Sequence, residues 1–284
     1  MAEMKRIVGK LIFLDIDGTI AAPWQKPSRA TVEAIRSAHA NGHKVFISTG
    51  RVETGVAESV RSIGFDGGIY SAGGRVVVNG TEILNRPMPV KLVQQMTDIM
   101  ELGKLVYMLE NTHGTCIIRN GDLSQIDMDQ FYASGESYRV LDERRRGLRQ
   151  IWAPEYRKLP VFKIDFLTES RTAADWLGEK IGSAAKVTRF DVLASDMPLV
   201  VGEVSDWNIN KGEALYSVCR YLDADPADCI AFGDSMNDAE ILQAAGIGIA
   251  MANSEAGVKE IADQVCESCE EDGIAKALAR MSLI

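Results

Sequence analysis

Short apolar runs alternate with segments of helical periodicity over the first 80 residues. Lys10–Leu14 (KLIFL) is too short for a helix and predicts a strand buried on both faces. A helical pattern then begins at Ser28, a capping residue, and closes at Asn41-Gly42. The elements predicted next are a strand at Lys44–Ser48, a helix over Val52–Ile63 and a short strand at Gly68–Tyr70.

The last third of the chain repeats this alternation. Strands that alternate with helices imply a parallel sheet covered on both sides. We therefore predict an α/β fold with a doubly wound, Rossmann-like parallel sheet. The predicted elements are a helix after Lys211-Gly212, a strand at Cys229–Phe232, a helix over Ser235–Ala245, a strand at Ile247–Ala250 and a helix over Ser254–Ile261.

The pattern changes in the middle of the chain, where charged helical segments and longer, more alternating strand candidates occur. These strand candidates are Thr115–Arg119, Val161–Leu167 and Leu199–Val204. The change predicts a second α/β domain at 86–204, inserted into a core domain formed by 1–85 and 205–284.

The charge of the chain limits the kinds of molecule that it is expected to bind. The 284 residues include 40 acidic and 31 basic side chains, a formal charge of −9, which argues against nucleic acid and anionic membrane surfaces. No apolar run reaches the roughly 20 residues of a membrane span, and the N-terminus lacks a signal-peptide pattern. We expect a cytoplasmic protein, by default a monomer or weak homodimer. Five scattered cysteines fit a reducing compartment: Cys116, Cys219, Cys229, Cys266 and Cys269.

Several other features favour ordinary structural roles. Cys266 and Cys269 form a C-x-x-C, but without a second pair incidental thiols are favoured over a zinc or redox site. Arg144–Arg146 is interpreted as a solvated helical face. The histidines, His39, His43 and His113, lie outside the candidate site described next.

Chemistry-bearing residues follow the predicted strands. Asp15 and Asp17 come directly after Lys10–Leu14, and side chains two apart in an extended chain point the same way. Parallel α/β sheets bind ligands beyond the carboxyl ends of their strands. A carboxylate can act as a nucleophile, and paired carboxylates attract a hard cation such as Mg²⁺. Taken alone, the pair is equally an acidic turn.

Three further segments add to this pair. Thr49 and Gly50 follow the second strand, and Lys211 at a helix start supplies a fixed positive charge. Further carboxylates follow a later apolar strand in Gly233–Asp238 (GDSMND). Carboxylates, a hydroxyl and a lysine at successive element ends predict a site for phosphoryl chemistry.

At this point the sequence resembles the haloacid dehalogenase (HAD) superfamily, in particular its Cof-type sugar-phosphatase branch. The matching segments are LDIDGT at 14–19, STGR at 48–51, NKGEAL at 210–215, GDSMND at 233–238, GIGIAMANS at 246–254 and EDGIAKAL at 271–278. The insertion resembles the α/β cap of this branch. Ser71–Gly74 departs from the Asn-Gly pair that such proteins often carry after the third strand.

The resemblance implies a Mg²⁺-dependent phosphatase acting on small phosphorylated metabolites, sugar phosphates in particular. Asp15 would be the nucleophile and a metal ligand, and Asp17 the general acid and base, with its carbonyl on the metal. Phosphate would be held by Thr49, Gly50, Lys211 and Asn237, and the metal by Asp15, Asp17, Asp234, Asp238 and Ser235.

Alternatives remain at the level of sequence. A phosphomutase would use the same core residues, and a phosphate-sensing protein would keep the fold without turnover. The inserted domain is expected to close over the site and read the leaving group. Candidate residues are Arg119, Trp152, Lys163 and Asp165, of which the last two can equally form a cross-strand ion pair facing solvent.

Overall fold

The computed structural model describes residues 9–22, 25–111, 114–119, 160–168, 170–194 and 197–284. The chain divides into two compact units. The core unit comprises 1–51, 56–85 and 209–284, and the inserted unit comprises 52–55 and 86–208. The predicted return to the core, at 205, lies four residues before the observed one. Trp152, Arg144–Arg146 and His113 lie outside the described residues, as do the side chains of Cys116 and Arg119.

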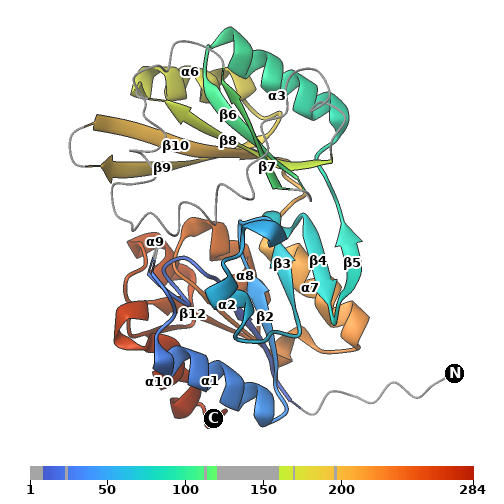
Figure 1. The fold of residues 1–284 in the computed structure, drawn as a ribbon, viewed down its shortest axis with the longest axis vertical. Coiled ribbons are helices and arrows are strands. Elements are labelled where there is room, and N and C mark those ends of the chain that lie inside the picture. The colour runs from blue at the N-terminus through green and yellow to red at the C-terminus, as the bar shows by residue number, and fades with distance from the viewer. Residues whose placement is uncertain (1–8, 23–24, 112–113, 120–159, 169, 195–196) are drawn as a thin grey trace, which may run out of the picture. The chain divides into compact units, whose positions relative to one another are not determined.

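The core unit is built on an eight-stranded sheet in the order β13-β12-β11-β1-β2-β3-β4-β5 (Figure 1). Its first six strands in that order are parallel, whereas β4 and β5 run antiparallel at one edge. The strands are β1 (Leu11–Leu14), β2 (Lys44–Ser48), β3 (Gly67–Tyr70), β4 (Arg75–Val78), β5 (Thr81–Asn85), β11 (Cys229–Gly233), β12 (Ile247–Met251) and β13 (Gln264–Cys266).

Helices cover both faces of this sheet, which confirms the doubly wound α/β fold. In β1, Ile12 and Leu14 pack on the side of α1 and α10, and Leu11 and Phe13 pack on the side of α7 and α8. All four side chains are fully buried, as the uniformly apolar run predicts. The helices of the core unit are α1 (Arg29–Ala40), α2 (Glu58–Arg61), α7 (Lys211–Leu222), α8 (Ala239–Ala244), α9 (Ala256–Ile261) and α10 (Gly273–Arg280).

One prediction for the segment between β2 and β3 needs correction. The helix predicted over Val52–Ile63 is wrong: only a 3-10 turn at Glu53–Gly55 and the four-residue α2 form. The apolar spacing of Val52, Val56 and Val60 is real, and all three are buried. However, Gly55 disfavours a helix, and Ala57 adopts an extended conformation that divides the segment.

The antiparallel edge hairpin was not predicted. β4 and β5 are joined by Asn79-Gly80, with φ values of +48° and +76°. Asn-Gly between two strand-forming runs is a strong hairpin signal, because both central residues of the tight turn need positive φ. This signal is present in the sequence and would have been sufficient to predict the hairpin.

The inserted unit contains a five-stranded antiparallel sheet in the order β7-β6-β8-β10-β9. α3 and α6 pack against each other, and α6 contacts β8 and β10, so these helices cover one face of the sheet (Figure 1). The predicted strands in the middle of the chain are all present. The elements are α3 (Val90–Leu102), β6 (Val106–Asn111), β7 (Gly114–Arg119), β8 (Val161–Thr168), α6 (Arg171–Ile181), β9 (Lys186–Ala194) and β10 (Met197–Ser205).

Candidate active site

The end of β1 places Asp15 at the carboxyl edge of the core sheet. The Asp15 backbone N–H donates to the carbonyl of Phe232 in β11 at 3.1 Å, which extends the pairing of these strands by one residue. Its side chain is 9% exposed. A largely buried carboxylate is therefore fixed at the edge where parallel sheets bind ligands.

Gly18 brings the turn after Asp15 against the loop that follows β11. Its φ is +82°, and a Cβ added to it would lie 2.2 Å from Oδ2 of Asp234. Only glycine permits this approach without displacing the carboxylate. Thr19 Oγ1 donates to Asp234 Oδ1 at 3.3 Å and joins these two loops. Asn253, which follows β12, donates from Nδ2 to the Gly18 carbonyl at 2.8 Å. Asn253 was not predicted as a site residue, although it lies within the segment 246–254 that carries the resemblance.

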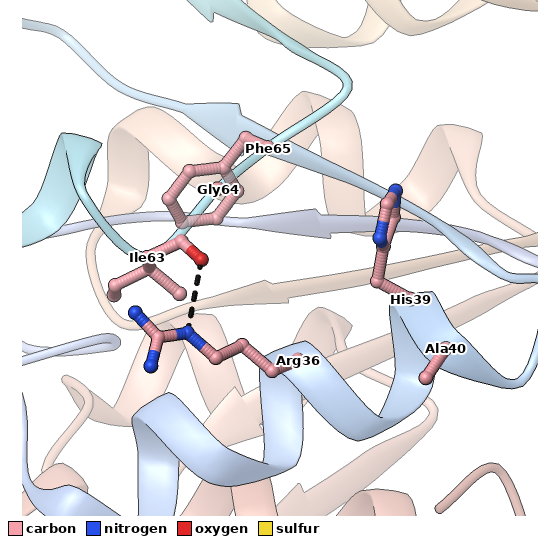
Figure 2. Close-up of a pocket in the computed structure, with 6 residues that line it drawn as sticks. All are labelled: Arg36, His39, Ala40, Ile63, Gly64 and Phe65. Atoms are coloured by element: carbon pink, nitrogen blue, oxygen red, sulfur yellow. Dashed lines mark hydrogen bonds between the residues drawn. The ribbon is translucent and has the colours of Figure 1, made fainter.

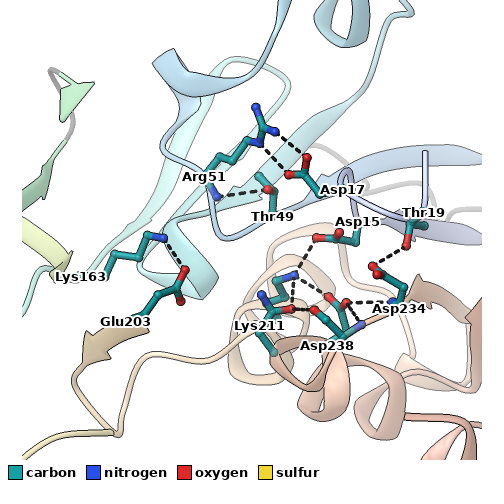
Figure 3. A network of polar contacts seen from close by, with 12 residues as sticks. Asp15, Asp17, Thr19, Thr49, Arg51, Lys163, Glu203, Lys211, Asp234 and Asp238 are labelled. Atoms are coloured by element: carbon teal, nitrogen blue, oxygen red, sulfur yellow. Dashed lines mark hydrogen bonds and ion pairs between the residues drawn. The ribbon is translucent and has the colours of Figure 1, made fainter. Parts of the chain in front are cut away.

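Lys211 crosses between the two acidic loops. It is the first residue of α7, whose N-cap Asn210 accepts a hydrogen bond from the Glu213 N–H at 2.8 Å. Its Nζ donates to Asp15 Oδ1 at 2.8 Å and to Asp238 Oδ1 at 2.5 Å (Figure 3). The side chain of Lys211 is fully buried. Burial opposes its positive charge, but Asp15 and Asp238 outweigh that effect and raise the pKa of Lys211.

The loop after β11 fixes Asp238 by a capping box. Asp238 Oδ2 accepts from the backbone N–H groups of Asp234 and Ser235, at 3.1 and 3.2 Å. Ser235 Oγ donates to Asn237 Oδ1 at 2.8 Å, and Lys211 Nζ donates to the same oxygen at 3.3 Å. Both carboxylate oxygens of Asp238 are thus hydrogen-bonded within the protein.

Three carboxylates and one ammonium gather at this point. One oxygen from each of Asp15, Asp234 and Asp238 lies within 4.8 Å of the others. Burial, Asp238 and Asp234 raise the pKa of Asp15 against the opposing effect of Lys211. Burial and Asp238 raise the pKa of Asp234 to about 7. With Lys211 counted, the group carries two negative charges in excess when all three carboxylates ionise, which is the charge that one divalent cation neutralises.

The predicted residues Asp17 and Thr49 form a second network beside the first (Figure 3). Arg51 holds the Asp17 carboxylate by two hydrogen bonds, Nε to Oδ2 at 2.7 Å and an Nη to Oδ1 at 2.5 Å. The Thr49 hydroxyl accepts from the Arg51 N–H at 3.1 Å, and Gly50 lies in the turn between them. Asp17 also acts to raise the pKa of Asp234, so the two networks are electrostatically close. Arg51 lies within the quoted STGR segment but was not predicted as a functional residue.

The two candidate residues of β8 belong to a charged cluster of the inserted unit. Lys163 Nζ lies 2.6 Å from Glu203, 3.1 Å from Asp165 and 3.8 Å from Glu110. Lys163 and Asp165 are 6% and 9% exposed, so the alternative of an ion pair facing solvent is wrong. Burial disfavours the charge of Lys163, yet the three carboxylates reverse this effect and raise its pKa. Glu110 lies in β6 and Glu203 in β10, and both strands pair directly with β8, which carries Lys163 and Asp165. Strand pairing therefore brings the four charged side chains together.

A separate depression of about 260 Å³ lies beside α1 and contains none of the predicted site residues (Figure 2). It is lined by Arg36, His39, Ala40, Ile63, Gly64 and Phe65. Arg36 is occupied there by the carbonyls of Ile63 and Ser62, at 3.2 and 3.1 Å. The guanidinium of Arg36 is already hydrogen-bonded, and the lining residues include no carboxylate. This depression therefore does not offer the metal-binding or nucleophilic groups of the acidic cluster.

The described helices include none with the length and apolar character needed to cross a membrane. Residues 12–278 match the family model of haloacid dehalogenase-like hydrolases. The putative phosphatase YkrA of Bacillus subtilis is 27% identical over 97% of this chain and 98% of its own length. A phosphoglycolate phosphatase of Methanopyrus kandleri is 26% identical over 95% and 96%.

The fold comparison agrees with the sequence comparison. The HAD subclass IIB sugar phosphatase BT4131 superposes with a TM-score of 0.78 at 22% identity, covering 97% of this chain and 100% of its own. At this identity the likeness concerns the fold. The family match spans most of the chain and confirms the resemblance predicted from the motifs. The chain therefore belongs to the haloacid dehalogenase-like hydrolases, and within them it is a Cof-type phosphatase, a phosphoric monoester hydrolase.

Proposed function

We propose that the chain hydrolyses small phosphate monoesters, sugar phosphates among them, through a phospho-aspartate formed on Asp15. The observation that carries this proposal is the pairing of a buried Asp15 carboxylate with the Lys211 ammonium at 2.8 Å. Lys211 neutralises charge that would otherwise repel a phosphate dianion approaching a carboxylate. The remaining oxygen of Asp15 is then available for in-line attack.

In the first step, a carboxylate oxygen of Asp15 bonds to phosphorus, and the bond from phosphorus to the leaving oxygen breaks. Asp17 gives a proton to that oxygen, so the alcohol leaves neutral. In the second step, Asp17 takes a proton from water, and the hydroxyl oxygen bonds to phosphorus and releases Asp15 and inorganic phosphate. Thr49, Gly50 and Asn237 are proposed to hold the phosphate oxygens with Lys211.

Mg²⁺ is the cofactor we propose, because the donors are carboxylate oxygens and their excess charge is that of one divalent cation. Asp15 and Asp234 would hold it directly, with the Asp17 carbonyl, and Asp238 and Ser235 would act through water. When bound, the ion supplies charge neutralisation for the transferred phosphoryl group. Residues 86–204 are proposed to form the cap that selects the leaving group.

The substrate class is inferred from the relatives. The name of one solved relative denotes a sugar phosphatase, and that of a sequence relative denotes a phosphoglycolate phosphatase. We expect a small phosphorylated metabolite, with neither nucleic acid nor membrane as a partner. Cytoplasmic location and a monomeric or weakly dimeric state stay predictions.

The test is phosphate release from a panel of phosphorylated metabolites, with MgCl₂ or with EDTA. Wild type should release phosphate only with the metal. Asp15→Asn should abolish turnover while its urea unfolding midpoint shows that it folds. Turnover by Asp15→Asn at the wild-type rate would refute the covalent mechanism, and isomerised sugar phosphate without phosphate release would identify a phosphomutase.

A further inference from the structure

Asp17, the proposed general acid and base, is held by Arg51, which has no role in the proposed steps. Both oxygens of Asp17 accept from the guanidinium of Arg51, at 2.7 and 2.5 Å. A planar fork that matches both oxygens of a carboxylate fixes its orientation as well as its position. The side chain of Asp17 is 40% exposed, so without this partner it would rotate in solvent.

The ion pair between Arg51 and Asp17 is not needed for the stability of the fold. Ion pairs with such exposure contribute little to the stability of a fold, because water screens them and ordering the side chains costs entropy. Yet Arg51 is itself ordered: its side chain is 23% exposed, and its N–H donates to Thr49 Oγ1 at 3.1 Å. Its carbonyl accepts from the N–H of Ser71 at 2.9 Å.

The backbone that anchors Arg51 adopts an unfavourable conformation. Ser71 and Ala72 have φ values of +52° and +55°, in the left-handed region that non-glycine residues rarely occupy. Ala72 N–H donates to the Thr49 carbonyl at 3.0 Å, so both residues bond to the turn that carries Arg51. Strained backbone of this kind persists where the surrounding contacts enforce it, and it concentrates near functional sites.

We propose that Arg51 is the positioning residue of Asp17: its guanidinium fixes the carboxyl group beside the leaving oxygen, through both oxygens when Asp17 is ionised and through the unprotonated oxygen when Asp17 carries the proton that it donates. The inference rests on the proposed function, since it requires Asp17 to be the acid and base. Acid–base catalysis is worth roughly a hundredfold to ten-thousandfold. Loss of the orienting partner should remove part of that factor, roughly tenfold to a hundredfold, while KM changes little.

The leaving group separates positioning from a structural role. We would measure kcat/KM, which reports the formation of phospho-Asp15, for glycerol phosphate and for 2,4-dinitrophenyl phosphate. An alkoxide needs a proton to leave, whereas dinitrophenolate does not. Arg51→Ala should therefore lose roughly tenfold to a hundredfold with glycerol phosphate and no more than about threefold with the dinitrophenyl ester. Arg51→Lys, which keeps the charge without the fork, should recover part of the loss.

A double-mutant comparison tests whether Arg51 acts through Asp17. In an Asp17→Asn background, Arg51→Ala should cause no further loss, because the group that it positions has been removed. Arg61→Ala, which removes an exposed arginine paired with Glu58, is the matched control and should retain wild-type kinetics. Urea unfolding midpoints would show that each variant folds.

Three results would overturn the proposal: wild-type kinetics in Arg51→Ala, an equal loss with both esters, or a loss in the Asp17→Asn background as large as in wild type. If Asp15→Asn is inactive and Arg51→Ala behaves as wild type, the positioning role fails and the proposed function stands. If Asp15→Asn is active, the proposed function itself fails.

Discussion

Asp234→Asn is expected to stabilise the metal-free protein while it abolishes metal-dependent activity. Burial and the nearby Asp238 raise the pKa of Asp234 from 3.8 to about 7. Below pH 3.8 the carboxyl is protonated in the folded and unfolded chain alike. Between pH 3.8 and 7 only the unfolded chain has ionised, so the free energy of unfolding falls as the pH rises through this window.

The shift gives the size of the effect. Each pKa unit corresponds to about 1.4 kcal/mol, so ionised Asp234 destabilises the metal-free fold by about 4 kcal/mol above pH 7. The asparagine keeps the shape without the charge, but weakens the hydrogen bond from Thr19 Oγ1. We therefore expect Asp234→Asn to raise the free energy of unfolding at pH 8 in EDTA by roughly 2–4 kcal/mol.

Urea denaturation at pH 4 and pH 8, in EDTA and in MgCl₂, checks this expectation. At pH 4 the two proteins should unfold at similar urea concentrations. At pH 8 Mg²⁺ should stabilise the wild type, since it binds the folded state, and leave the variant almost unchanged. Glu33→Gln, which removes an exposed carboxylate beside Arg29, is the control and should show the wild-type dependence of stability on pH and on Mg²⁺. Equal stability of wild type and Asp234→Asn at pH 8 in EDTA would refute the reasoning.

Two further substitutions have matched controls. Gly18→Ala places a Cβ 2.2 Å from the Asp234 carboxylate and should weaken Mg²⁺ affinity roughly 10–100-fold by calorimetry. Gly80→Ala has a similar positive φ and no atom within 4 Å of its Cβ, so equal weakening there would argue against the clash. Asn210→Ala removes the N-cap of α7 and should lower the free energy of unfolding by about 1 kcal/mol. Because Lys211 is the next residue after Asn210, turnover should fall as well. The control is Ser170→Ala at the N-cap of α6, which should reduce stability alone. Unchanged turnover in Asn210→Ala would contradict the link between the N-cap and the position of Lys211.

The sequence was sufficient to predict the elements whose local pattern and tertiary surroundings agree. Lys10–Leu14 is apolar at every position but the first, and only a strand covered on both faces buries such a run. The residues that follow strand ends, Asp15 and Asp234 among them, could be brought together in advance because parallel strands share one edge. Lys211 was placed by its position at a helix start.

Other features depend on contacts that periodicity does not encode. Val52, Val56 and Val60 repeat at a helical spacing, yet Gly55 and the extended Ala57 prevent a continuous helix. The partnership of Arg51 with Asp17 joins residues 34 positions apart and has no local signal beyond the motif itself.

The charged cluster of the inserted unit shows the same limit. Lys163 and Asp165 were recognised as sharing one face of a strand. Whether that face was solvated depended on which strands lay beside it. Glu110 and Glu203 come from segments 53 and 40 residues from Lys163, and strand order brings them to it.

The wide separation in sequence between Lys211 and its partner Asp15 has a consequence for biosynthesis. The bond of Lys211 to Asp15 spans 196 positions, and its bond to Asp238 spans 27. A ribosome therefore makes the entire insertion before the ammonium that balances Asp15 exists, and the balancing loop after β11 emerges later still. Contacts of such separation form late because the intervening chain must first be ordered. The acidic cluster and its lysine are thus among the last parts of a nascent molecule to form, and incomplete chains carry Asp15 without the ammonium that pairs with it.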